Sequence, residues 1–157
     1  MSEAPVVLIV EDGDEYFENL SQFVPGPHYL QAHGARAALA MLASQPVSLV
    51  YLDMRFDRLP REELVGDIAR LTREQGGVER ALRHLANHQG LYILQALREH
   101  GFGAVPVILA YDFSREPQRF ERLSQLHPSL TWVPDAISPD EIRARLERLT
   151  QARPRGE

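Results

Sequence analysis

The sequence contains no cysteine and no lysine. Without cysteine the chain has no disulfide, no thiolate metal site and no cysteine nucleophile, which agrees with a reducing compartment. Without lysine it has neither the ammonium group of a P-loop nor a Schiff-base nucleophile, and all 17 basic residues are arginines. These two absences exclude much of conventional enzyme chemistry.

Long hydrophobic runs are also missing. No apolar stretch approaches the ~20 residues that a transmembrane helix needs. The N-terminal segment has no basic residue ahead of its apolar run, unlike a secretion signal. The net charge is −5 and the arginines are scattered among acids, which argues against a basic face for nucleic acid. We therefore expect a cytoplasmic protein that contacts neither membranes nor nucleic acid.

Five short apolar runs alternate with helical segments. The three strongest are rich in β-branched residues and apolar enough to be buried on both faces, at 5–10, 47–52 and 105–111. Two weaker runs are 28–33 and 130–133. Because parallel strands need helical crossovers of right-handed sense, this pattern predicts an α/β fold with a doubly wound, five-stranded parallel sheet.

The length of the chain limits the number of domains that it can form. At 157 residues it suffices for one domain and is short for two. We expect a single domain over residues 1–152, followed by a polar tail at 153–157. The residues after the expected final helix are too few for an output domain, so we expect a stand-alone module.

Acidic side chains follow two of the predicted inner strands. Glu11 and Asp12 come directly after the first strand, and Asp53 follows the run 47–52. Ligands of open α/β sheets bind beyond the carboxyl ends of the strands. Three carboxylates at one edge repel each other unless a divalent cation such as Mg²⁺ lies among them. The pattern predicts a Mg²⁺ site, and its alternative is the ordinary preference for acids at solvated strand ends and helix N-termini.

Four segments together resemble the receiver domain of bacterial response regulators, the CheY-like family. They are VVLIVEDGDEYFENL, VSLVYLDMRFD, GLYILQALREHG and VPVILAYDFS. The resemblance implies a flavodoxin/CheY-like fold and a role in two-component signalling or a phosphorelay. It implies that Glu11, Asp12 and Asp53 hold Mg²⁺ together with the backbone carbonyl of Arg55. Asp53 would then be the nucleophile that accepts a phosphoryl group from a histidine kinase, while Mg²⁺ neutralises the phosphoryl oxygens.

Three positions depart from the family pattern. The family has a serine or threonine at the end of the fourth strand and a lysine at the end of the fifth, where this chain has Tyr111 and Val133. A slip of one residue would give Ala110 or Asp112, neither of which has a hydroxyl. Leu130 stands where an aromatic switch residue is expected. Without the cation an aspartyl phosphate loses a charge-assisted contact worth roughly 1.5–3 kcal/mol. These departures favour an atypical receiver, or pseudo-receiver.

A segment of about residues 59–88 separates Asp53 from the family's next helix, whose matching glycine is Gly90. The spacing of apolar residues in this segment predicts a hairpin of two helices, over 61–74 and 78–88. The apolar stripes of the two helices are Leu64, Ile68 and Leu71, and Val78, Leu82 and Leu85. These stripes either fold back on the parent domain or form a surface for a partner protein or a second copy of the chain.

Two histidines lie in the same segment. His84 and His88 have the i,i+4 spacing that can place two imidazoles on one metal. No third ligand is evident from the sequence, so a solvated helix face is a better interpretation than a zinc site.

Three functions remain open at this point. The leading hypothesis is a non-enzymatic signalling module that acts by contact with other signalling proteins, without phosphorylation. The second is a working phosphoacceptor that binds Mg²⁺ and is phosphorylated at Asp53 by a histidine kinase. The third is a hydrolase or phosphotransferase built on the acids; it ranks last because the lysine and the hydroxyl side chain are missing.

Overall fold

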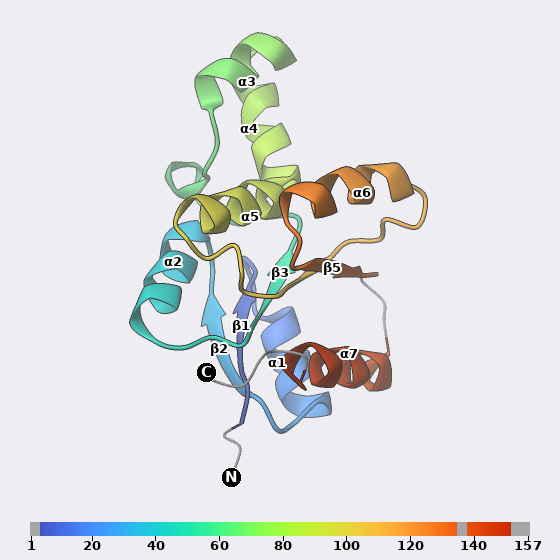
Figure 1. Ribbon diagram of the computed structural model, residues 1–157. Coiled ribbons are helices and arrows are strands. Elements are labelled where there is room, and N and C mark those ends of the chain that lie inside the picture. The colour runs from blue at the N-terminus through green and yellow to red at the C-terminus, as the bar shows by residue number, and fades with distance from the viewer. Residues whose placement is uncertain (1–3, 135–137, 152–157) are drawn as a thin grey trace.

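The computed structural model describes residues 4–134 and 138–151 of the chain, so the predicted tail at 153–157 lies outside the described residues. The strands are β1 (Val6–Val10), β2 (His28–Ala32), β3 (Leu49–Asp53), β4 (Val107–Ala110) and β5 (Leu130–Val133). They form one parallel sheet in the order β2-β1-β3-β4-β5 (Figure 1). The predicted doubly wound, five-stranded parallel sheet is confirmed.

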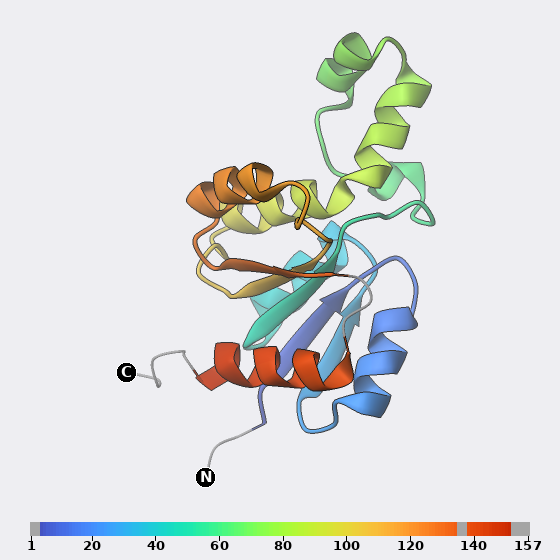
Figure 2. The same ribbon diagram turned by 90° about the vertical axis from the view of Figure 1, so that its right-hand side faces the viewer.

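Helices cover both faces of this sheet. They are α1 (Glu15–Phe23), α2 (Ala35–Ser44), α5 (Gln89–Glu99), α6 (Pro117–Leu126) and α7 (Pro139–Gln151). The first and last, α1 and α7, pack on one face, whereas α2, α5 and α6 pack on the other (Figure 2). No helix within the described ranges is both long and apolar enough to cross a membrane.

The core follows the alternation of side chains along the strands. Leu8 and Leu52 are fully buried toward α2 and α5, while Ile9 and Tyr51 are buried toward α1 and α7. Strands buried on both faces require nearly continuous apolar runs, which is why these runs could be recognised in the sequence. At the edge where β1 and β3 end, the strand order reverses direction, which is where doubly wound sheets bind their ligands.

The segment between β3 and α5 forms a helical hairpin that projects beyond the sheet (Figures 1 and 2). It consists of a 3-10 turn, η1 (Arg61–Glu63), followed by α3 (Ile68–Gln75) and α4 (Val78–Asn87). The first helix was expected from residue 61, and that boundary is wrong. Gly66 has a φ of 142°, which a helix does not allow, and Asp67 caps the shorter helix by accepting a hydrogen bond from the backbone N–H of Arg70 at 3.0 Å.

The apolar stripes of the hairpin largely pack against each other. Leu71 and Leu85 are buried in a small cluster with Ala81, and Leu64 and Ile68 are partly buried against it. Leu82 is half-buried and Val78 is 49% exposed. The stripe residues therefore stabilise the hairpin itself, and Val78 is the member that is clearly open to solvent.

Candidate functional site

A cleft of about 480 Å³ lies at the carboxyl edge of the sheet, where β1 and β3 end. All three predicted acids, Glu11, Asp12 and Asp53, line it. Arg55 and Tyr111 line it as well. The sheet topology therefore brings the predicted site residues together, as parallel neighbouring strands require.

Glu11 is directed toward helix α1. Its carboxylate accepts hydrogen bonds from the backbone N–H groups of Tyr16 at 3.0 Å and Phe17 at 2.9 Å, so it caps the N-terminus of this helix. The residue is only 1% exposed, and burial raises the pKa of its carboxyl group although the two N–H donors lower it. Both carboxylate oxygens of Glu11 are thus engaged in holding the helix.

Asp12 is paired with Arg58, in the loop after β3. Its Oδ2 accepts a hydrogen bond from the backbone N–H of Arg58 at 2.7 Å, and its Oδ1 lies 3.3 Å from the Nη2 of the guanidinium. The side chain of Asp12 is 2% exposed. An aspartate this enclosed needs a counter-charge or N–H donors, and Arg58 supplies both.

Arg58 also binds Glu15, in the first turn of α1. Its two terminal nitrogens donate to the two carboxylate oxygens of Glu15 at 3.0 and 2.8 Å, which is a bidentate pair. The hydrogen bond to Arg58 lowers the pKa of Glu15 to about 2. One guanidinium therefore pairs with two of the acids beside the cleft and offsets one of their two negative charges.

The sequence reasoning identified neither Arg58 nor Glu15 as a site residue. A signal was present, because residues 11–15 hold four acids within five positions and such a run needs nearby positive charge. The loop after β3 carries two arginines, Arg55 and Arg58. Which of them turns back to the acids is decided by the path of the loop.

Asp53 ends β3 and faces the same cleft. Its Oδ1 accepts a hydrogen bond from the backbone N–H of Met54 at 2.8 Å. The neighbouring strand places Ala110 opposite it in the register. The loop after Asp53 is fixed by Gly90 of α5, whose N–H donates to the carbonyl of Met54 at 2.9 Å. A Cβ on Gly90 would lie 2.3 Å from the carbonyl oxygen of Asp53, so the close approach requires glycine.

The acids do not converge as a Mg²⁺ site. Glu11 is engaged with the N–H groups of α1, and Asp12 is engaged with Arg58. Across residues 4–134 and 138–151, no group of three or more acidic or histidine side chains is arranged to hold a metal ion. The predicted ligands share a cleft, but their donor atoms do not fit a divalent cation in this arrangement.

The three altered switch positions make contacts other than with Asp53 in this structure. The hydroxyl of Tyr111 donates to Oε2 of Glu116 at 2.5 Å, and this bond raises the pKa of Tyr111 and lowers that of Glu116. Val133 is fully buried in the core toward α7, and Leu130 is 4% exposed in the core toward α5. Buried aliphatic side chains offer a phosphoryl group neither a hydroxyl nor a cation.

The two histidines of the hairpin lie together at the end of α4. The ring centroids of His84 and His88 are 4.4 Å apart, and Nδ1 of His88 lies 3.0 Å from the carbonyl oxygen of His84. Burial lowers the pKa of His84, with the neighbouring charge of His88 as a smaller cause. No third metal ligand joins them among the described residues.

No protein-family model and no curated protein matches this chain. Solved structures do match. The receiver domain of the Francisella response regulator 1452 is 17% identical, with a TM-score of 0.62 over 94% of this chain and 97% of that one. The signal receiver domain of a Syntrophus aciditrophicus signal transduction histidine kinase is 17% identical, with a TM-score of 0.65 over 98% of this chain and 96% of that one. The Vibrio cholerae chemotaxis protein CheY4 is 14% identical, with a TM-score of 0.61 over 93% and 98%.

At such identities the likeness concerns the fold. It agrees with the strand order and with the helices on both faces of the sheet. The chain therefore has the fold of a response regulator receiver domain, with a helical hairpin inserted between β3 and α5.

Proposed function

We propose that this chain is an atypical receiver of bacterial two-component signalling that acts in the cytoplasm through contacts with other signalling proteins, independently of phosphorylation. In this proposal it is not an enzyme. The observation that carries the proposal is the position of Arg58, which binds Asp12 and Glu15 beside the cleft. Arginine is charged at every physiological pH, so it supplies these acids with a permanent counter-charge that does not depend on a metal ion.

The altered positions support the same proposal. A phosphoryl group on Asp53 would find Ala110 opposite it in the register and Tyr111 bound to Glu116. Val133, where the resemblance implies a lysine, is fully buried. A phosphorylated state would therefore have few groups through which to change the rest of the fold.

A titration with Mg²⁺ tests this proposal. Trp132, the only tryptophan, lies next to Val133 and serves as the fluorescent probe. We expect no saturable response to Mg²⁺ or to beryllofluoride, a phosphoryl mimic, in the unmodified chain. We expect Arg58→Ala to gain Mg²⁺ binding, because it removes the counter-ion of the acids. A response of the unmodified chain that is lost in Asp53→Asn would contradict the proposal.

A working phosphoacceptor is the second candidate, and one observation favours it. Asp53 lines the same cleft as Asp12, at the end of a central strand, as the resemblance implies for a site phosphorylated by a histidine kinase. In that case Arg58 would have to leave the acids before Mg²⁺ binds. The same titration separates the two candidates, because this one predicts binding in the unmodified chain at high Mg²⁺ concentration.

A further inference from the structure

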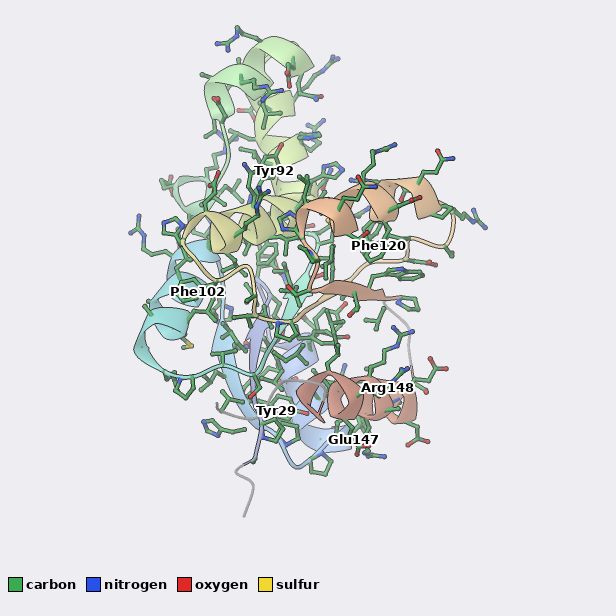
Figure 3. The ribbon with its side chains drawn as sticks, viewed as in Figure 1. Tyr29, Tyr92, Phe102, Phe120, Glu147 and Arg148 are labelled. Carbon is green, nitrogen blue, oxygen red and sulfur yellow. The ribbon has the colours of Figure 1, made fainter. Side chains whose placement is uncertain are left out.

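A second concave surface lies between α5 and α6, at the base of the hairpin. It is a groove of about 330 Å³ and shares no lining residue with the acidic cleft. Tyr92 on α5 lines it, and Phe120 of α6 packs near Trp132 of β5 (Figure 3). The two helices lie side by side over the sheet in both ribbon views (Figures 1 and 2).

The ionisable groups in this groove carry only one sign of charge. Two arginines and three histidines line it, and no lining residue is acidic, although the chain as a whole has a net charge of −5. The lining basic residues are His84, His88, Arg98, Arg119 and His127. Burial lowers the pKa of His84 and His127, so at neutral pH the positive charge of the groove comes chiefly from Arg98 and Arg119, and this charge favours an anionic partner.

These basic residues gather at the two ends of the groove. Arg119 lies in the first turn of α6 and is close enough to His84 for its charge to reach that ring. Arg98 lies in the last turn of α5, and its charge reaches the ring of His127, which follows α6. At a rise of ~1.5 Å per residue, the span from Arg119 to His127 is about 12 Å along the helix axis.

Of the two arginines, Arg98 is the one open to a partner, whereas Arg119 lies over the ring of Tyr111 at 5.6 Å and its Nη1 is 3.5 Å from the Tyr111 hydroxyl. Arg98 is exposed and forms no ion pair with any residue in the described ranges. Nη1 of Arg119 lies 3.1 Å from Oε1 of Glu116, in a partly exposed pair of a kind that contributes little stability. Acids outside the lining are Glu116 beside Arg119, Glu74, whose charge reaches His84, and Glu99, which accepts a hydrogen bond from Gln95 at 3.2 Å.

Aliphatic side chains form the wall between the two cationic ends. They are Leu91 on α5 and Leu123 and Leu126 on α6. Leu126 is 55% exposed, and α6 buries none of its residues completely. Leu91 and Leu123 are partly buried against the core, so Leu126 is the member of this wall that is open to the apolar side chains of a partner.

We infer that this groove docks an amphipathic helix of a protein partner that carries acidic side chains about two turns apart on either side of an apolar face. Seven residues of a helix span about 10.5 Å, which suits the distance between the cationic ends. A small anion would pair with the arginine at one end of the groove and would not cover the leucines. The inference goes beyond the proposed function, and it rests on that function only in taking the chain to act by contact.

The test is a selection of peptides on the full chain. A displayed library of random peptides of about 15 residues, roughly four helical turns, is enriched on the immobilised protein, and the affinity of the selected peptides is measured by fluorescence anisotropy. We expect acidic residues about two turns apart around an apolar face. We expect the double variant Arg98→Gln/Arg119→Gln to weaken binding about a hundredfold, about tenfold for each arginine.

The matched control is Arg83→Gln/Arg122→Gln. It removes the same charge from exposed positions of α4 and α6 that do not line the groove, and we expect it to leave the affinity nearly unchanged. Circular dichroism and urea unfolding verify that both double variants are folded. Because Arg119 contacts Tyr111, which lines the acidic cleft, Arg98→Gln alone is the variant that leaves the cleft untouched, and we expect it to weaken peptide binding about tenfold. Phosphorylation at Asp53 would overturn the proposed function and leave this inference intact.

Three results would overturn the inference. The first is an absence of enriched peptides, or enrichment of peptides without the acidic amphipathic pattern. The second is equal binding to the groove variant and the control variant. The third is saturable binding of inorganic pyrophosphate in the groove without peptide binding, which would make it a site for small anions instead.

Discussion

Arg58 reaches the acidic cleft from the loop after β3 and binds two carboxylates with one guanidinium. The difference from a metal ion is that this cation is covalently part of the chain. It cannot be removed by dilution or chelation, and its planar group offers two parallel hydrogen bonds to Glu15 in place of the coordination shell of a divalent cation. Asp12 and Glu15 therefore have a counter-charge that requires no bound ligand.

Replacement of Arg58 tests this contact directly. In Arg58→Ala we expect the pKa of Glu15 to rise from about 2 toward its ordinary value of 4.5, because the largest cause of the depression is the hydrogen bond to Arg58. A depressed carboxyl pKa stabilises the fold above the unfolded value of 4.5, and that contribution is lost as the pH falls toward 2. Titration of the glutamate side-chain carbons by NMR measures the shift, with Arg55→Ala as the control. An unchanged Glu15 pKa in Arg58→Ala would contradict the conclusion that the hydrogen bond to Arg58 lowers it.

Gly90 permits α5 to begin against the loop after Asp53. Gly90→Ala places a Cβ 2.3 Å from the carbonyl oxygen of Asp53, and we expect it to lower the free energy of unfolding by about 1–3 kcal/mol. Gly103→Ala is the control, because its Cβ would come no closer than 3.5 Å to a neighbouring atom. Urea unfolding of both variants measures the difference. Equal stability of the two would show that the close approach at Gly90 is relieved without cost.

The acids of the cleft were predictable from the sequence, but their partners were not. Glu11, Asp12 and Asp53 follow apolar strands, and parallel neighbours must bring them to one edge. Where each carboxylate points depends on contacts that no spacing encodes. Glu11 turns to the N–H groups of α1, and Asp12 turns to a loop arginine far along the chain.

At the scale of the elements, the strands were predictable because strands buried on both faces must be apolar throughout. The first helix of the hairpin was placed wrongly, since its apolar spacing extends across Gly66 while the backbone there has a φ of 142°. A Cβ at this glycine would lie 2.2 Å from a side-chain carbon of Leu85. Hydrophobic periodicity detects the faces of a helix, but it does not detect a turn that tertiary packing imposes.

The hairpin has its own small core, centred on Leu85. A Leu→Ala change at a buried site costs about 2–5 kcal/mol. Because few other contacts stabilise α3 and α4, we expect Leu85→Ala to increase amide hydrogen exchange in these helices more than in β1 and β3. Val78→Ala, at a position that is 49% exposed, is the control and should leave exchange unchanged. Uniform loss of protection over the sheet and the hairpin would show that the hairpin is not a separate unit of stability.

At the scale of the whole molecule, the receiver fold is retained while Arg58, a residue of the chain itself, pairs with two acids at its acidic edge. The topology places Asp53 at the reversal of strand order, where a doubly wound sheet binds ligands. Fold and acidic edge alone do not determine activity, because activity depends on the groups around the reacting atom. Here those groups include Arg58 and Tyr111. They support the proposal that the chain signals through contacts with other proteins.

The most direct measurement is the intact mass of the protein after incubation with acetyl phosphate and Mg²⁺. We expect unchanged masses for the unmodified chain and for Asp53→Asn, because Arg58 holds Asp12 and because Tyr111 and Val133 stand where the family has a short hydroxyl side chain and a lysine. The addition of one phosphoryl group to the unmodified chain, and its absence in Asp53→Asn, would contradict the account and establish a working phosphoacceptor.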